Sequence, residues 1–389
     1  MSQINIRNLS NENEDGAPNL VGISSFSATS YVVPPVGTTA QRPENPQGGD
    51  LRFNTDSASL EYFKGDTLGW TQIEMTSPDL DGGVRGLSMG GEIAASPNGQ
   101  LQIDYFNIST LGNGQDFGDL TVARGTAGAC ASRTRGLCMS GYMGGYHDEI
   151  DYVTISSLGD AIDFGNLPDE VQGVDALSNS IRSVMTSGSE GTAPAYGITN
   201  VLSYVNIATT GHAKDFGDQQ RNNSYCGTCA SSTRGIIAGG YDPYNTISNT
   251  IEYLTIATTG NTIDFGDIGG VRVNCMGISN STRGIFAGGT SPTNLNNIAY
   301  ITIATLGNGV EFGDMTGSGG EGRSMGSSGM ASPTRGLFMG GNYPASPTWT
   351  KVNDVDYVEI ATTGNSKDFG DLSVAMSAIS GCSNGHGGL

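Results

Sequence analysis

The chain has 389 residues, of which 60 are glycine and only 14% are charged, and its 38 acidic and 18 basic residues give a formal net charge of −20. This charge argues against binding to nucleic acid or to an anionic membrane surface through bulk electrostatics. The sequence shows no signal peptide and no apolar run of about 18 residues, so we expect no membrane insertion.

The first 78 residues are rich in Asn, Pro, Gly, Ser and Thr and show little periodicity. Residues 1–45 have too few periodic apolar positions to bury themselves, so we expect an extended attachment arm. Residues 46–78 contain LRFNT, a polar turn DSAS and LEYFKG, followed by a tryptophan. This pattern predicts a β-hairpin module whose apolar side the tryptophan covers. A lone hairpin is marginally stable, so the module should pack on the rest of the chain, on a second copy or on another protein.

Six copies of one segment run from Val84 to the C-terminus. Each copy has an arginine strand that usually ends in Gly-Gly, an alternating run with a tyrosine, and a D-F-G-D-like element. The arginines, spaced by about 50 residues, are Arg85, Arg135, Arg182, Arg234, Arg283 and Arg335. A period near 50 that is built from short strands predicts a β-propeller.

Distances within the repeat separate a constant part from a variable part. The tyrosine lies 12 residues before the D-F-G phenylalanine in all six copies, as from Tyr105 to Phe117. The connection after Gly-Gly varies in length, and an insertion near residues 317–323 lengthens the connection between the last two copies. In a sheet of four up-and-down strands both variable connections emerge on the same side. One face is therefore expected to be constant, and the other to carry recognition.

The two ends of the repeat region complement each other. The chain ends with LSVAMSAISGCSNGHGGL, which matches the first strand of a seventh copy, whereas the first copy lacks such a strand. We expect the C-terminal strand to complete the first blade and to leave no open sheet edge. The predicted fold is all-β: a six-bladed propeller over residues 79–389, preceded by the arm and the hairpin module.

The repeat GIIAGGYDPYNTISNTIEYLTIATTGNTIDFGD resembles those of kelch β-propellers, in which a loop and a tyrosine-containing strand follow a strand that ends in Gly-Gly. The resemblance covers about residues 80–389. The phenylalanine of D-F-G stands where a kelch repeat usually has a tryptophan, and no kelch partner or activity is carried over.

A second resemblance lies in the first 78 residues. D-G-A-P at Asp15–Pro18, and TTAQRP, GDLRFNTDSASLEYFKGDTLGW and TQI between Thr38 and Ile73, resemble segments near the N-termini of bacteriophage virion proteins, notably those of marine cyanobacterial phages. The resemblance implies a virion protein, made in the host cytoplasm and displayed on the particle exterior. It also implies contacts with other virion proteins through residues 1–78, in a homo-oligomer or a symmetric multicopy assembly.

Three functions fit this resemblance. A tail fibre or receptor-binding component that adheres to the host is expected first. A head-decoration, head-fibre or tail-collar protein without a receptor role is the structural alternative, and a surface-polysaccharide hydrolase is a minor one.

The loops after Gly-Gly are polar with scattered aromatic side chains, which can stack on sugar rings or contact another protein. We expect this face to bind a host surface glycan or protein. The alternative is that these side chains only stabilise long loops. The candidate partner-binding residues are Tyr142, Tyr146, Tyr196, Tyr241, Tyr244, Tyr343 and Trp349.

Most groups that suggest catalysis or metal binding are explained by the repeat. The six cysteines occupy slots where other copies have apolar residues, so we expect buried thiols rather than disulfides. For the same reason we do not expect zinc at the lone C-x-x-C of Cys226 and Cys229. His147, His212 and His386 occupy different repeat positions and should not converge. The repeated arginines are expected to be structural. We therefore expect no enzyme, no cofactor and no metal.

The D-F-G-D acids recur in strand and turn context. We expect them to cap turns by meeting backbone N–H groups or the repeat arginine. Calcium binding by pairs of these hard oxygen ligands is the alternative.

Overall fold

The computed structural model describes residues 34–56, 59–72, 84–95, 98–190, 197–316, 322–326, 328–345 and 348–389. The chain divides into two compact units, Met1–Ser77 and Pro78–Leu389, which are considered separately. Among the described residues, all regular elements are strands except one 3-10 helix, η1 (Thr39–Gln41). The fold is all-β, as the sequence predicts.

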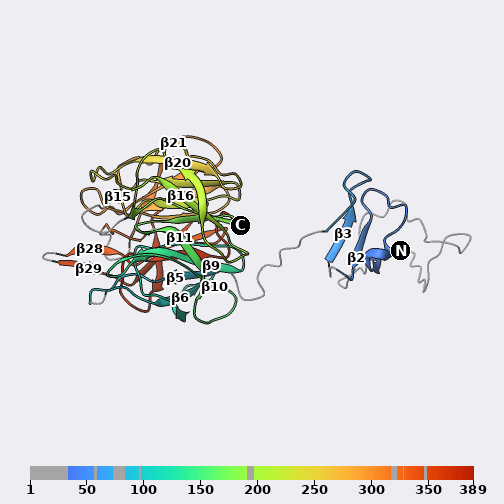
Figure 1. Cartoon of the computed structure of the whole chain (residues 1–389), viewed down its shortest axis with the longest axis horizontal. Coiled ribbons are helices and arrows are strands. Elements are labelled where there is room, and N and C mark those ends of the chain that lie inside the picture. The colour runs from blue at the N-terminus through green and yellow to red at the C-terminus, as the bar shows by residue number, and fades with distance from the viewer. Residues whose placement is uncertain are drawn as a thin grey trace, which may run out of the picture. The chain divides into compact units, whose positions relative to one another are not determined.

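The described part of unit 1 is one sheet in the order β1-β2-β3-β4. Figure 1 shows its paired strands β2 and β3. Its strands are β1 (Val36–Gly37), β2 (Leu51–Asn54), β3 (Ser59–Phe63) and β4 (Trp70–Gln72). The predicted hairpin is confirmed as the antiparallel pair β2 and β3. Trp70 packs against Phe63 with 5.5 Å between ring centroids, so the tryptophan covers the hairpin as expected.

The boundary of the arm needs a correction. Strand β1 and helix η1 lie within residues 1–45, and β1 pairs in parallel with β2. Arg42, just after η1, donates to the buried Glu61 on β3, with 2.6 Å between Nη2 and Oε2. This hydrogen bond, more than any other contact, holds the pKa of Glu61 below its usual range. Residues 36–42 therefore belong to the compact unit, and residues 1–33 of the predicted arm lie outside the described part.

The described part of unit 2 contains six antiparallel sheets of four or more strands, one for each copy of the repeat, which we number sheet 1 to sheet 6, and one separate two-stranded sheet. Sheet 1 consists of β32 (Ser380–Ser383), β5 (Arg85–Met89), β6 (Gln102–Asn107) and β7 (Gln115–Asp119). Sheet 2 begins with β8 (Gly128–Ala131), β9 (Arg135–Tyr142), β10 (Tyr146–Thr154) and β11 (Ile162–Gln172). Sheet 3 consists of β12 (Ala176–Ser178), β13 (Arg182–Met185), β16 (Val201–Asn206) and β17 (Lys214–Asp218).

The remaining sheets have the same strand order. Sheet 4 consists of β18 (Gly227–Ala230), β19 (Arg234–Ala238), β20 (Thr250–Thr255) and β21 (Ile263–Asp267). Sheet 5 consists of β22 (Met276–Ser279), β23 (Arg283–Ala287), β24 (Asn297–Thr302) and β25 (Val310–Asp314). Sheet 6 consists of β26 (Met330–Ala331), β27 (Arg335–Met339), β30 (Asp354–Glu359) and β31 (Lys367–Asp371).

The four-strand prediction for each copy is confirmed, including the shared first sheet. β32, from the C-terminus, pairs with β5, and Cys382 lies opposite Leu87. Sheet 2 departs from the pattern, because β14 (Ser189–Glu190) and β15 (Gly197–Ile198), from the loop of the third copy, add to β11. A separate hairpin of β28 (Asn342–Ala345) and β29 (Thr348–Lys351) projects from the rest of unit 2 (Figure 1).

The glycine after the repeat arginine makes room for the neighbouring sheet. A Cβ atom on Gly336 would lie 1.9 Å from Cδ1 of Ile278, and one on Gly284 would lie 2.4 Å from Sγ of Cys229. Real Cβ atoms do not approach other atoms so closely, so the side chain of one inner strand fills the space over the next glycine. This contact explains why apolar residues and cysteines alternate at the inner-strand position that Ile278 and Cys229 occupy.

Each repeat arginine bridges two sheets. Its guanidinium carbon lies 4.4–4.8 Å from the ring centroid of the tyrosine in the same copy. Its Nη1 atom donates to a carbonyl of the next sheet, as from Arg283 to Ile360 at 3.0 Å. Arg335 of sheet 6 donates in the same way to Ile108 of sheet 1, at 3.1 Å. The structural role predicted for the arginines is confirmed, and in the described residues they donate to carbonyl groups of the next sheet.

The constant turn between the tyrosine strand and the D-F-G-D strand also forms hydrogen bonds with the neighbouring sheet. Gly307 N–H donates to Phe265 O at 3.0 Å, and the side chain of Asn308 accepts from Asp267 N–H at 3.0 Å. In the third copy the accepting group is Nδ1 of His212, which takes the N–H of Asn166 at 3.1 Å. A turn side chain thus caps the D-F-G-D backbone. Among the D-F-G-D acids, the side chain of Asp163 accepts a hydrogen bond from a backbone N–H group, that of Gly165, at 3.1 Å, as predicted for these acids.

Candidate functional site

The first strand of each sheet is its inner strand, and these strands contact one another in succession: β32, β8, β12, β18, β22 and β26. The variable connections meet at one end of the inner strands. Backbone hydrogen bonds of 2.7–3.1 Å link consecutive sheets at this end. They run from Thr126 N–H to Ala378 O, Gly173 to Thr126, Tyr225 to Gly173, Asn274 to Tyr225 and Met325 to Asn274. We call this end, with the loops around it, the loop face.

Four tyrosines gather on the loop face. Tyr225 stacks on Tyr241, with 5.5 Å between centroids and 11° between ring planes. Tyr142 and Tyr146 meet edge to face at 5.8 Å. Burial raises the pKa of Tyr225, and nearby Tyr241, Glu92 and Tyr146 raise it further. Tyr142 and Tyr146 come from β9 and β10 of sheet 2, and Tyr225 and Tyr241 lie just before β18 and just after β19 of sheet 4. We call these four residues the tyrosine cluster.

Three of the predicted partner-binding residues, Tyr142, Tyr146 and Tyr241, belong to this cluster. Tyr225 was missed. A sequence signal for it existed, because the same slot in other copies holds smaller residues such as Gly173. In the structure Tyr225 adopts a φ of 55°. A Cβ atom on Gly173 would lie 2.4 Å from the Tyr225 ring, so this glycine allows the ring to lie across it.

The other predicted residues lie apart from the cluster. Tyr244 is 88% exposed on a turn in which Asp242 Oδ1 accepts the N–H groups of Tyr244 and Thr246 at 2.9 and 2.8 Å. Trp349 is 61% exposed on β29, and Tyr343 lies on β28 opposite Thr350. Tyr196 lies outside the described residues.

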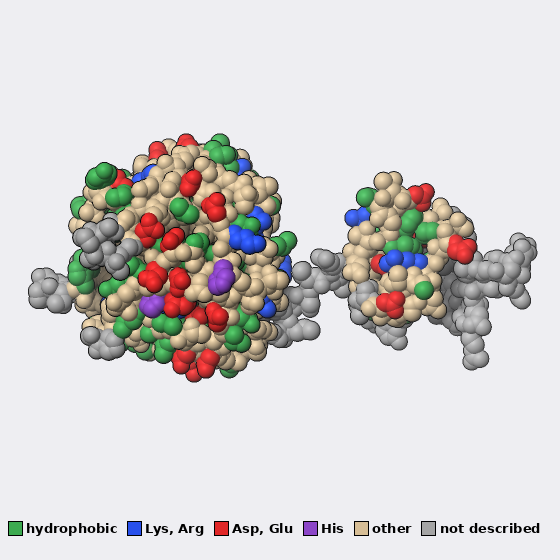
Figure 2. Space-filling view, viewed as in Figure 1, with side chains coloured by type: hydrophobic (Ala, Val, Ile, Leu, Met, Phe, Trp, Pro, Cys, Tyr) green, Lys and Arg blue, Asp and Glu red, His purple; other side chains and the backbone are tan. Residues whose placement is uncertain are grey.

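A charged pair connects the projecting hairpin to the loop face. Lys351 Nζ donates to the backbone carbonyl of Glu92 at 2.9 Å and lies 3.4 Å from its Oε2. Burial lowers the pKa of Lys351, and Glu92 opposes this shift. Acidic side chains outnumber basic ones on the visible face of unit 2, in keeping with the net charge (Figure 2).

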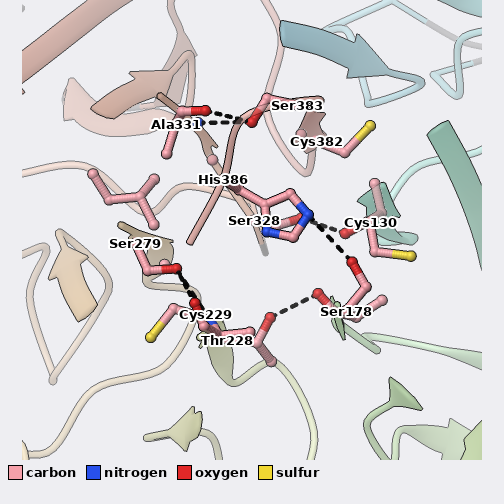
Figure 3. Close-up of a pocket in the computed structure, with 17 residues that line it drawn as sticks. Cys130, Ser178, Thr228, Cys229, Ser279, Ser328, Ala331, Cys382, Ser383 and His386 are labelled. Carbon is pink, nitrogen blue, oxygen red and sulfur yellow. Dashed lines mark hydrogen bonds between the residues drawn. The ribbon is translucent and has the colours of Figure 1, made fainter. Parts of the chain in front are cut away.

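The inner strands enclose a small polar cavity of about 40 Å³, to which all six contribute (Figure 3). Serine and alanine alternate around it. Three of these serines donate to the carbonyl of an alanine in the preceding sheet: Ser178 to Ala131 at 2.8 Å, Ser279 to Ala230 at 2.8 Å and Ser383 to Ala331 at 2.6 Å. These hydroxyls satisfy backbone groups that face an adjacent sheet without a ladder partner.

His386 closes one end of this cavity. Its Nδ1 accepts Gly388 N–H at 3.1 Å, so Nε2 carries the proton and donates to Ala131 O at 2.8 Å. Burial lowers the pKa of this imidazole, which favours its neutral form. His147 instead pairs with Glu149 at 3.0 Å, and His212 caps a turn. The three histidines stay apart, as the sequence predicts.

Buried acids precede the repeat tyrosine in four copies. They are Asp104, Asp151, Glu252 and Asp356, each at most 2% exposed. Asp104 accepts from Ser373 Oγ at 2.5 Å and Asp151 from Thr121 Oγ1 at 2.6 Å, whereas Asp356 pairs with the buried Arg323. The acids thus hold the connection that arrives from the preceding sheet.

All six cysteines are buried and free, as predicted. Burial raises the pKa of Cys275 to about 11, which keeps its thiol protonated at neutral pH. Within the described ranges no group of three or more His, Cys, Asp or Glu side chains is placed to hold a metal ion.

No helix in the described part of the chain is long and apolar enough to cross a membrane.

The sequence matches no model of a known protein family, and no curated protein is significantly similar to it.

Proposed function

We propose that the six sheets of unit 2 are the blades of a closed, six-bladed, kelch-like β-propeller. The support is that sheet 6 contacts sheet 1 through the same bonds that join other neighbouring sheets. Arg335 reaches Ile108, Gly112 N–H donates to Phe369 O at 3.0 Å, and Asp371 N–H donates to Asn113 Oδ1 at 3.1 Å. Shared contacts of this kind leave each blade flanked by two others.

The proposed function is adhesion: a virion protein, of the tail-fibre or receptor-binding type, that attaches to the host through the loop face. The observation that carries it is the tyrosine cluster, together with exposed Tyr244 and Trp349 on loops of the same face. Large rigid aromatic side chains with polar neighbours supply most binding energy at protein and sugar interfaces. The resemblance of residues 38–73 to phage virion proteins supports the location of the protein on a particle.

The use of three buried acids supports a non-catalytic role. Asp104, Asp151 and Asp356 are buried and engaged with groups from the preceding blade. A glycoside hydrolase needs two carboxyl groups that flank an accessible glycosidic bond. Buried acids that connect blades do not serve this purpose.

Replacing Tyr244 and Trp349 with alanine should weaken binding of the particle to host cells by roughly 2 kcal/mol or more, with little change in folding. Their exposure of 88% and 61% means that few intramolecular contacts are lost. The measurement is adsorption of variant particles at matched protein copy number. Leu306→Ala, at a position that is 59% exposed on a constant turn, is the matched control and should adsorb normally. Normal adsorption of the double variant would favour the structural alternative.

Removing residues 1–76, so that the chain starts at Ser77, should leave the melting midpoint of unit 2 unchanged but prevent incorporation into particles. The reason is that unit 2 has its own buried core, while the proposed attachment surface lies in unit 1. Circular dichroism melting and protein analysis of purified particles measure the two effects. Incorporation at full copy number would contradict attachment through unit 1.

A further inference from the structure

Arg272 is a buried cation of unit 2 that pairs with no carboxylate in the described part of the chain. It lies before β22 and is 1% exposed. Its Nη1 donates to Gly288 O in a long hydrogen bond of 3.5 Å, and its Nε has no partner among the described residues. Burial lowers the pKa of Arg272, but a guanidinium stays protonated in proteins. A buried charge without a counterion is costly, so this site needs an anion.

Two equivalent arginines of the repeat show which group is missing. Arg323 donates to the first carbonyl of Gly-Gly in its sheet, as Arg272 does, and its Nη2 pairs with Asp356. Arg124 pairs through Nη2 with Asp151, with 2.9 Å between Nη2 and Oδ2. Both acids directly precede the repeat tyrosine. The arginine of this slot is therefore balanced by an acid of the following sheet in both of these copies.

Sheet 5 has an alanine in place of that acid. Ala299 directly precedes the repeat tyrosine and pairs with the arginine strand in the same register as Asp356. Sheet 3 also lacks the acid, with Ser203 in its place, but there the buried arginine is replaced by Val171. Sheet 5 thus keeps the cation, Arg272, while it has lost the carboxylate that would balance it.

A backbone donor for the missing carboxylate is also present. In three sheets the buried acid accepts the N–H of the residue two positions after the preceding D-F-G-D, at 3.1–3.2 Å, as Asp151 accepts from Thr121. The equivalent residue before sheet 5 is Gly269, which is exposed. Its N–H donates to no group within the described ranges. The two kinds of donor that hold Asp151, an arginine and a backbone N–H, therefore both occur beside Ala299 without an acidic acceptor.

We propose that unit 2 binds a small monovalent anion of the chloride type between the guanidinium of Arg272, the N–H of Gly269 and the methyl group of Ala299. Guanidinium and backbone N–H groups are the donors that proteins use to bind anions, and one negative charge balances one arginine. The exposed Gly269 gives the ion a route from solvent. The anion joins sheets 4 and 5 as the carboxylates join the other sheets, and it is independent of the adhesive role proposed for the loop face.

The test is the melting midpoint of the full chain at pH 7 in NaCl or sodium gluconate at equal ionic strength. Gluconate has the same charge but is too bulky to reach the buried Arg272. Chloride should raise the midpoint in a saturable manner, by about 5 °C near a hundredfold excess over the dissociation constant. Ala299→Asp restores the carboxylate, so it should raise the midpoint in gluconate and abolish the chloride-specific rise. Ala304→Asp, the same substitution at an exposed turn of sheet 5, should retain that rise.

A second variant keeps the test decisive if Ala299→Asp does not fold. Arg272→Met removes the charge while keeping an unbranched side chain, and its midpoint should be the same in both salts. Equal midpoints of the natural chain in chloride and gluconate would overturn the proposal. A chloride-specific rise that persists in Arg272→Met or in Ala299→Asp would overturn it as well, because the anion would then bind elsewhere.

Discussion

Deleting residues 374–389 is expected to abolish the cooperative unfolding transition of unit 2. The deletion removes β32, which pairs with β5 and contacts β8 and β26. It also removes Met376, Ile379 and Cys382, which are at most 4% exposed. Each such side chain contributes roughly 1.5–3 kcal/mol by burial, and the lost backbone pairing adds to this. The sum is comparable with the 5–15 kcal/mol that typically stabilises a domain.

Circular dichroism melting measures this effect, with two controls. Removing an equal length of 16 residues from the N-terminus, residues 1–16, should leave the transition of unit 2 unchanged. A permuted unit 2 that begins with residues 372–384, continues through a short turn into Arg85 and ends at Asp371 should regain a cooperative transition. The other five sheets already connect the inner strand to the arginine strand in this order, as from Ala131 to Arg135. An unchanged midpoint for the C-terminal deletion would show that β32 does not close unit 2.

The parts of the fold that could be predicted are those in which every copy makes the same contact. Arg283 lies over Tyr300, and Tyr300 meets Phe312 edge to face at 6.0 Å. Because the same three residue types recur in all six copies at compatible positions, the sequence alone shows that they have a shared structural role. The register of the C-terminal strand was predictable for the same reason, since Cys382 occupies the slot of Cys130 and Cys229.

The loops were harder to predict because their structure depends on residues from other copies. Strand β14 forms because Glu190 pairs with Val171 of the preceding copy, and no periodicity within the loop indicates this partner. The hairpin of β28 and β29 is tied down by Lys351, whose partner Glu92 lies more than 250 positions away. Contacts of such long range leave little trace in a local pattern.

The candidate sites show the same division. Polar loops with aromatic residues indicated Tyr142, Tyr146 and Tyr241, but the stacking of Tyr241 on Tyr225 depends on the glycine at position 173 of another sheet. The surroundings of His386 could not be predicted, because its partners Ala131 and Gly388 come together only once the inner strands surround it. Asp175 is acidic in one copy only, at a slot where most other copies have a small residue, so it carried no repeated signal.

Asp175 should make the stability of unit 2 depend on pH, and Asp175→Asn should remove that dependence. Burial raises the pKa of Asp175 to about 7 from its ordinary value of 3.8. As pH rises, the unfolded chain therefore loses this proton before the native state does. The favourable contribution is complete below about pH 4 and is lost as pH rises through 7. Three pKa units correspond to about 4 kcal/mol of unfolding free energy.

Urea unfolding of the full chain between pH 4 and pH 8 measures this difference. The asparagine variant keeps an acceptor for Ala176 N–H and carries no charge, so it should gain about 4 kcal/mol relative to the natural chain between the two limits. Asp116→Asn, at an exposed acid, should parallel the natural chain instead. His386 works in the opposite sense, since its lowered pKa removes stability as pH falls below about 6.5, but it is present in all three proteins and cancels in the comparison. A difference between Asp175→Asn and the natural chain that stays constant with pH would mean that the carboxyl group is already ionised in the native state at pH 4.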